Sequence, residues 1–150
     1  MTASVTPRLK IAVRAAVRMG DGLLLIAHHD PHLHYNLPGG SVRPDEPMLD
    51  TLNRKCAESL GDGVQIEDLL FVHETLPGGS GSDPSVFHKL EFVMAARVGA
   101  AFRLDRASAS IEPVALDRLA SAPLLPPIQG LLLEALKDAP PAAHRLLAVD

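Results

Sequence analysis

The stretch 37–61 constrains the fold more than any other part of this chain of 150 residues. It reads "LPGGSVRPDEPMLDTLNRKCAESLG", a tight glycine turn followed by a segment with helical periodicity. Pro47 suits the first turn of a helix, and Asp45 or Glu46 can cap it. A glycine just past the last periodic residue suits the exit. We therefore predict a helix over residues 47–60.

Two faces of this helix carry different side chains. One face is apolar and is predicted to be buried: Leu49, Leu52, Cys56 and Leu60. Lys55, Glu58 and Ser59 share a second face, about 100° round the axis from the first. This second face borders the core without entering it. We therefore expect these three side chains to be held firmly and to stay accessible, as catalytic groups must be.

Strand signals flank the helix on both sides. Residues 9–19 alternate and are rich in β-branched side chains, and residues 23–29 form a second apolar run after the turn "GDG". The two runs predict a β-hairpin. Two more strands are predicted, over residues 64–76, with a break near Asp68, and over residues 86–98.

The remaining segments complete the expected architecture. A short helix is predicted at 116–120, inside an otherwise irregular stretch, and an amphipathic helix at 128–138. Residues 30–36 and 77–85 are expected to be loops, the latter because of its glycine and serine content. The segment after residue 138 is expected to be a flexible tail, as is the N-terminus. Strands, helix, strands and helix in this order predict an α+β fold with a mixed sheet between helices.

Composition sets the class of protein. A hydrophobic fraction of 47% and a charged fraction of 21% suit one globular domain, with its core over about residues 10–138. The net charge of -4 and the lack of a basic tract argue against binding extended nucleic acid. No apolar run reaches the roughly 18 residues of a membrane span. With no apolar leader and one cysteine, a cytoplasmic location is expected.

The glycine turn and helix resemble a Nudix box. The family pattern keeps its spacing without a gap, and its matching positions here are Gly40, Glu46, Arg54, Cys56, Glu58 and Gly61. The flanking segments 15–40, 87–98 and 114–136 are also similar to those of the family. The resemblance covers roughly residues 10–138 and implies a Nudix-type α/β/α sandwich.

The resemblance also implies an activity and a site. Nudix enzymes hydrolyse a nucleoside diphosphate linked to another group, and they usually need Mg²⁺ or Mn²⁺. By resemblance the metal would be held by Glu58 and by the backbone carbonyl near Gly40. Gly39, Gly40 and Arg54 would contact substrate. The pair of Glu46 and Arg54 would tie the loop to the helix.

The chain departs from the family pattern at specific positions. Lys55 and Ser59 stand where the family has glutamates, and Asp62 stands at an aliphatic position. Carboxylates at i, i+3 and i+4 share a helix face and repel one another unless a cation compensates. Here the ammonium of Lys55 would instead repel a metal ion. The sequence therefore predicts a weak or altered hydrolase, with Mg²⁺, Mn²⁺ or no metal, or an inactive module that binds a nucleotide-like ligand or a protein partner.

Other residues have alternative interpretations. Lys55 would either bind a phosphate directly as a point cation or pair with Glu58 on the surface. His34 and Tyr35 belong to a segment that lies near the substrate in the resembled fold, so both are candidates for substrate binding. Histidines 28, 29, 32 and 34 have no second cluster at a spacing typical of zinc sites. The leucines at 131–133 would serve a homodimer interface or the core.

Overall fold

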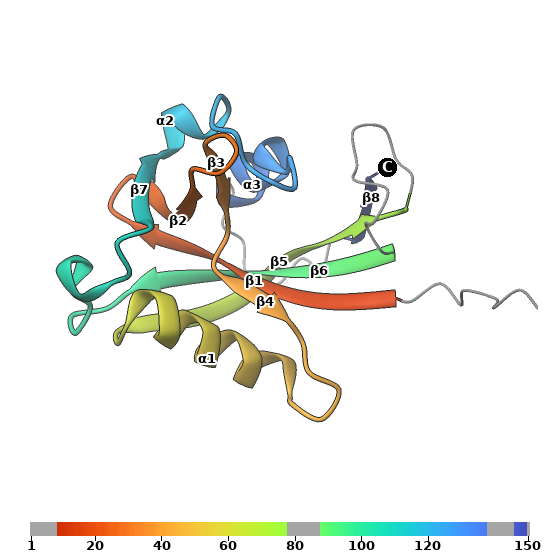
Figure 1. Cartoon of the computed structure of the whole chain (residues 1–150), viewed down its shortest axis with the longest axis horizontal. Coiled ribbons are helices and arrows are strands. Elements are labelled where there is room, and N and C mark those ends of the chain that lie inside the picture. Colours follow the sequence, from red (N-terminus) through yellow and green to blue (C-terminus); the bar gives the residue numbers. More distant parts are fainter. Residues whose placement is uncertain (1–8, 78–87, 138–145, 150) are drawn as a thin grey trace, which may run out of the picture.

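The structure is a computed structural model that describes residues 9–77, 88–137 and 146–149. Its strands are β1 (Leu9–Met19), β2 (Gly22–His28), β3 (His34–Asn36), β4 (Gly39–Ser41), β5 (Val64–Thr75), β6 (His88–Val98), β7 (Ile111–Ala115) and β8 (Leu146–Val149). Its helices are α1 (Met48–Leu60), α2 (Leu116–Leu119), α3 (Gln129–Lys137) and the single 3₁₀ turn Leu104–Arg106. Figure 1 shows how they are arranged.

One mixed sheet organises the domain. The main path of strands is β3-β2-β1-β6-β5-β8, while β4 pairs with β1 and β7 pairs with β2. β1 runs parallel to β6, and β5 runs parallel to β8, whereas the other pairs are antiparallel. β1 and β4 thus place the glycine turn beside the centre of the sheet.

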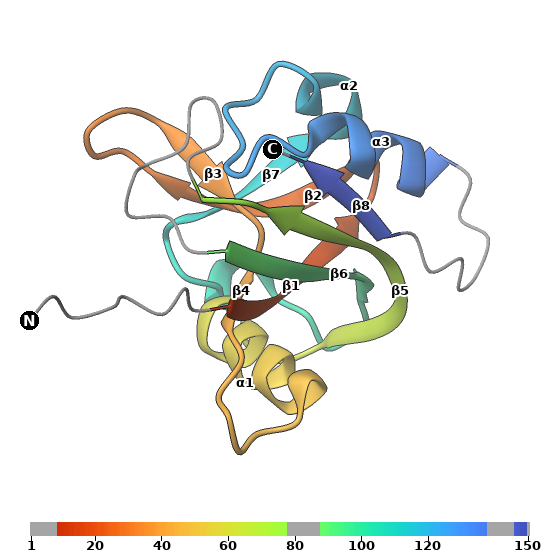
Figure 2. The ribbon, with the colours of Figure 1, turned by 90° about the vertical axis from the view of Figure 1, so that its right-hand side faces the viewer.

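Helices cover both faces of the sheet, as Figure 2 shows. α1 packs Leu52, Cys56 and Leu60 against one face, in a cluster with Val13 and Leu24. On the other face, α3 packs against a second cluster, whose buried members include Phe71 and Leu132. The α+β sandwich with a mixed sheet is confirmed. The leucines of α3 join this core, with Leu132 fully buried and its two neighbours partly buried.

Several predicted elements lie where expected. The hairpin of β1 and β2 turns at Gly20 and Asp21. β5 has irregular register between Ile66 and Phe71, around the predicted break. α3 begins and ends within one residue of its expected bounds. Predictions for residues 1–8, 78–87 and 138–145 lie outside the described residues.

Three short strands correct the prediction. Part of the expected loop 30–36 forms β3, part of the expected irregular stretch forms β7, and the expected tail contributes β8. β7 contains Pro113, and proline cannot donate a hydrogen bond to a strand ladder. β7 pairs only with β2 among the described strands, so it is an edge strand, which tolerates proline. β7 and β8 pair with strands distant in sequence, whereas β3 pairs with the neighbouring strand β2.

The start of α1 also differs from the prediction. Pro47 is the N-cap, and neither Asp45 nor Glu46 caps the helix with a side chain. Leu49 is 46% exposed, although it was expected to be buried, while Thr51 is fully buried. Thr51 donates a hydrogen bond to Glu46, so the incoming loop folds onto this side of the first turns. The Glu46 side chain is thus bonded to Thr51 and does not cap the helix. In the first turns of α1, Thr51 is buried in place of Leu49.

None of the helices that the structure describes combines the length and apolar character needed to cross a bilayer.

Candidate functional site

The glycine turn is held tightly against β1. Gly40 pairs with Val13, Gly39 pairs with Arg14, and Ala15 donates a backbone hydrogen bond to the carbonyl of Pro38. Gly39 has φ +137°, and a Cβ there would overlap the carbonyl oxygen of Val13. Glycine is therefore required at position 39 both for its backbone conformation and for the close approach of two strands.

Glu46 is tied to α1 by two partners. Its Oε1 accepts hydrogen bonds from Thr51 Oγ1 at 2.6 Å and from Arg54 Nη2 at 3.0 Å. Arg54 Nε also donates to Glu46 Oε2 at 3.3 Å. The hydrogen bonds from Arg54 and then Thr51 lower the pKa of Glu46 to about 2. The loop before α1 is thus anchored eight residues along the helix.

Glu58 lies between two cations. Arg54 Nη1 donates to its Oε1 at 3.3 Å, and Lys55 Nζ is 3.8 Å from its Oε2. The Glu58 side chain is 57% exposed. Both carboxylate oxygens therefore face positive charge from the same helix.

Lys55 lies across the glycine turn. A Cβ built on Gly40 would stand 3.1 Å from Lys55 Cε and 3.5 Å from its Cδ. The hydroxyl of Ser59 donates to the backbone carbonyl of Lys55 at 3.0 Å. The structure thus brings Gly40, Lys55, Glu58 and Arg54 together. We call these residues, with Gly39 and Ser59, the box surface.

A second polar cluster lies on the opposite face of the sheet. Glu91, only 1% exposed, accepts a hydrogen bond from Arg14 Nε at 3.2 Å and has Lys89 Nζ 3.3 Å from its other oxygen. Arg14 also donates to the carbonyl of Leu37 at 3.1 Å. Arg14 therefore links the segment before the glycine turn to β6.

Buried His73 completes this cluster. It pairs in register with Glu91, is 2% exposed, and neither ring nitrogen has a hydrogen-bond partner among the described residues. Burial lowers its pKa, and Lys89 adds to that effect, whereas Glu91 opposes it. Sequence analysis did not select Arg14 or His73. A charged residue between Ala12 and Ala16, which are buried on a central strand, is the feature that could have identified Arg14.

The NUDIX domain profile matches residues 8–136. The chain belongs to the Nudix family. Comparison with curated proteins finds no match.

Solved Nudix structures share the fold at low sequence identity. An ADP-ribose pyrophosphatase from Streptococcus suis has TM-score 0.65 and 22% identity, covering 95% of this chain and 100% of that chain. MutT protein from Methanosarcina mazei Go1 has TM-score 0.69 and 18% identity, covering 91% and 99%. A UDP-X diphosphatase has TM-score 0.65 and 20% identity, covering 97% and 70%.

Nudix proteins generally use divalent metal ions, which need a set of oxygen donors. Mg²⁺ prefers several oxygen ligands in octahedral array. Within residues 9–77 and 88–137, no group of three or more His, Cys, Asp or Glu side chains could hold a metal ion. Glu58 is paired with cations, and Ser59 directs its hydroxyl to the helix backbone. The residues of this Nudix box therefore do not fit a metal cluster.

Other carboxylates are engaged elsewhere. Glu74 contacts His88 at 2.7 Å, Glu91 lies between Arg14 and Lys89, and Glu112 accepts a hydrogen bond from Tyr35. Each belongs to its own local interaction, and none joins Glu58 in a metal-binding group among the described residues. The missing glutamates of the Nudix box are thus not replaced by these three side chains.

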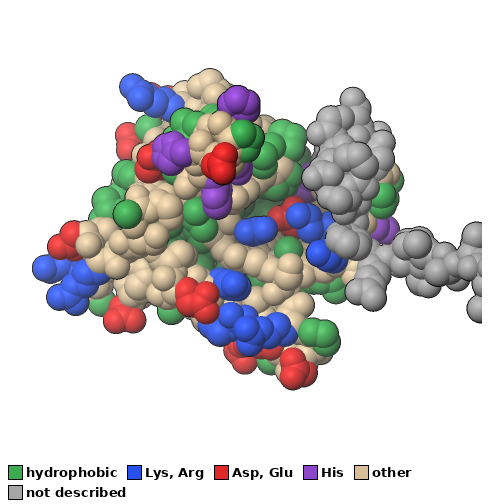
Figure 3. Space-filling model, in the orientation of Figure 1, with side chains coloured by type: hydrophobic (Ala, Val, Ile, Leu, Met, Phe, Trp, Pro, Cys, Tyr) green, Lys and Arg blue, Asp and Glu red, His purple; other side chains and the backbone are tan. Residues whose placement is uncertain are grey.

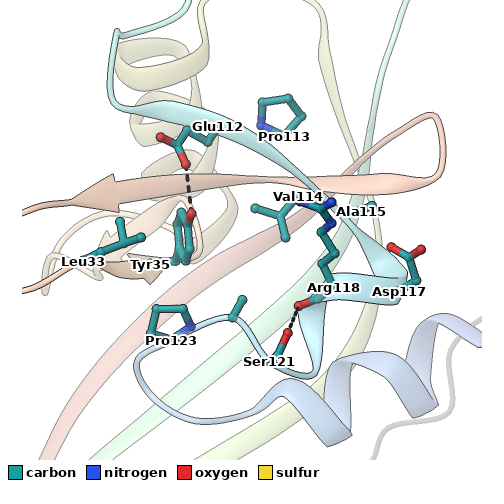
Figure 4. A pocket seen from close by; sticks show the side chains of 11 residues that line it. Leu33, Tyr35, Glu112, Pro113, Val114, Ala115, Asp117, Arg118, Ser121 and Pro123 are labelled. Atoms are coloured by element: carbon teal, nitrogen blue, oxygen red, sulfur yellow. Dashed lines mark hydrogen bonds between the residues drawn. The ribbon is translucent and has the colours of Figure 1, made fainter.

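Tyr35 lines a different cleft from the box surface. Its hydroxyl donates to Glu112 Oε2 at 2.9 Å, and both residues border a cleft of about 620 Å³ between β3, β7 and α2 (Figure 4). Burial and then Glu112 raise the pKa of Tyr35. No residue of the box surface lines this cleft.

His34 lies at the hairpin of β2 and β3. Its ring stacks on His28, with centroids 4.9 Å apart and planes at 14°. Its Nδ1 is 3.0 Å from the carbonyl of His32. The predicted site residues are thus divided between the box surface, this histidine stack and the cleft that contains Tyr35.

Proposed function

We propose that this Nudix protein binds nucleoside diphosphate derivatives at the box surface and has lost most of the hydrolytic activity of the family. The observation that carries the proposal is the state of Glu58, whose two carboxylate oxygens are paired with Arg54 and Lys55. A carboxylate compensated in this way attracts a divalent cation poorly, because its charge is already balanced. Lys55 and Ser59 supply no further anionic oxygen.

The ligand class rests on family membership and on the surviving scaffold. The glycine turn, the pair of Glu46 and Arg54, and helix α1 are all intact in this chain. The ADP-ribose pyrophosphatase and the UDP-X diphosphatase with the same fold are named for nucleoside diphosphate derivatives. We extend that ligand class, and not a particular substrate, to this protein.

The test is formation of AMP and ribose 5-phosphate from ADP-ribose, and of UMP and glucose 1-phosphate from UDP-glucose, with Mg²⁺ or Mn²⁺. Chromatography compares the wild type with a Lys55→Glu, Ser59→Glu double variant. We expect slow or no turnover by the wild type. The double variant restores three carboxylates on one helix face and should turn substrate over in a chelator-sensitive manner. Wild-type turnover that exceeds that of the double variant would contradict the proposal.

The alternative is a module that binds a nucleotide-like ligand or a protein partner without any turnover. The full pairing of Glu58 favours it. Wild-type protein that binds ADP-ribose but forms no AMP from it under any metal condition would select this alternative.

A further inference from the structure

We propose that the ammonium of Lys55, and not a metal ion, contacts the diphosphate of the ligand on the box surface. This inference rests on the proposed function, since it specifies how that ligand is held. The residues of the box do not fit a metal cluster. Instead, the Lys55 side chain lies beside both Gly40 and Glu58, the two residues that would hold a metal by resemblance to the family.

The position of Lys55 is set by packing along its whole side chain. Its Cε, Cδ and Cγ stand 3.1, 3.5 and 3.7 Å from a Cβ built on Gly40. The aliphatic part therefore lies along the face of the glycine, between β4 and α1. Because glycine has no side chain, the lysine can extend over the turn and bring its ammonium beside Glu58.

The ammonium retains donors for a ligand. It approaches Glu58 only at an ion-pair distance of 3.8 Å and makes no hydrogen bond to any residue of the described chain. The side chain is 37% exposed, so ligand oxygens can reach it. An ammonium has three N–H donors, and charge-assisted bonds to phosphate oxygens are stronger than neutral ones.

The surrounding charges favour an anion over a cation. Two carboxylates beside the glycine turn are already paired, Glu46 with Arg54, and Glu58 with Arg54 and Lys55. Figure 3 shows lysine and arginine side chains gathered where β1, β4 and α1 meet. A surface of this kind attracts a diphosphate without needing a metal to neutralise it.

Isothermal titration calorimetry with the α,β-methylene analogues of ADP and UDP tests the inference, because these diphosphates are not hydrolysed at the bridge. Binding is measured in excess EDTA and again with Mg²⁺. The variants are Lys55→Met, which removes the charge and keeps the length, and Lys55→Arg, which keeps the charge. Lys137→Met is the matched control, since Lys137 ends α3 on the other side of the sheet (Figure 2). Thermal melts check that every variant is folded.

We expect the wild type to bind equally well in EDTA and in Mg²⁺. Lys55→Met should weaken binding about 10- to 100-fold, the usual range for a charged hydrogen bond, while Lys55→Arg retains most of it and Lys137→Met is unchanged. Binding that needs Mg²⁺, or that survives in Lys55→Met, would overturn the role of Lys55 and leave the proposed function standing. No binding of either analogue under either condition would overturn both.

Discussion

Lys55 of α1 lies against Gly40 of β4, with Cε 3.1 Å from the position of a Cβ on that glycine. Gly39, the neighbouring residue, is restricted by backbone instead, because its Cβ would overlap the carbonyl oxygen of Val13. Two adjacent glycines therefore differ in what a methyl group would meet. A methyl group at Gly40 would meet the flexible side chain of Lys55, whereas a methyl group at Gly39 would meet the backbone of β1.

Gly39→Ala and Gly40→Ala should consequently differ in stability. At position 39 the positive φ and the backbone overlap should destabilise the fold by about 2 kcal/mol or more. At position 40 Lys55 can move aside, so the change should stay within roughly 1 kcal/mol. Urea unfolding of the two variants measures the difference. Equal losses at the two positions would show that Lys55 is as fixed as the backbone.

The pair of Glu46 and Arg54 should make stability depend on acid. The pKa of Glu46 is lowered from 4.5 to about 2, so its contribution is complete above pH 4.5 and is lost as the pH falls toward 2. Glu46→Gln should therefore lower the urea midpoint at pH 7, and the difference from the wild type should shrink below pH 4. Glu67→Gln, which breaks the exposed ion pair with Arg97, is the control. A difference that is constant with pH would contradict this account.

Arg14 pairs with the buried carboxylate of Glu91, and loss of this ion pair should be costly. Arg14→Met leaves a carboxylate that is 2% exposed with Lys89 as its remaining cation, and should destabilise the fold by about 3 kcal/mol. Arg97→Met, at the exposed pair with Glu67, should cost less than about 1 kcal/mol. Chemical denaturation compares the two. The inference that the buried carboxylate of Glu91 depends on Arg14 fails if both losses are alike.

His73 should contribute a second dependence on pH. Its pKa is lowered from the ordinary value of 6.5, so the unfolded chain binds a proton more readily than the folded one. Stability should therefore fall as the pH drops below 6.5, and His73→Leu should remove that part of the fall. His32→Asn, at an exposed position, is the control. Thermal melts between pH 5 and 8 test this, and identical slopes for wild type and His73→Leu would refute it.

Local signals explain which parts of the fold were predictable. The hairpin turn at Gly20 and Asp21 and the periodicity of α1 lie within short stretches of sequence. β3 has three residues, which is too few for a periodic pattern, and its partner β2 decides that it is a strand. β7 contains Pro113, which is acceptable only because the strand lies at an edge.

The contacts of the site also differ in how far the sequence could predict them. Lys55 and Glu58 share a helix, so their spacing alone predicted their proximity. Arg14 and Glu91 are 77 positions apart, and their contact depends on the parallel pairing of β1 with β6. Tyr35 directs its hydroxyl to Glu112, also 77 positions away. Contacts of this range are created by the tertiary fold and leave no spacing pattern to detect.

Cys56 gives the chain a practical property. It is the single cysteine, it is 3% exposed, and burial raises its pKa to about 11. Thiol reagents act on the thiolate, so the folded protein should be almost inert to maleimides. A cysteine introduced at Ser59 would then be the one labelled position, and a fluorophore attached there would report on events at the box surface without any background from the native thiol.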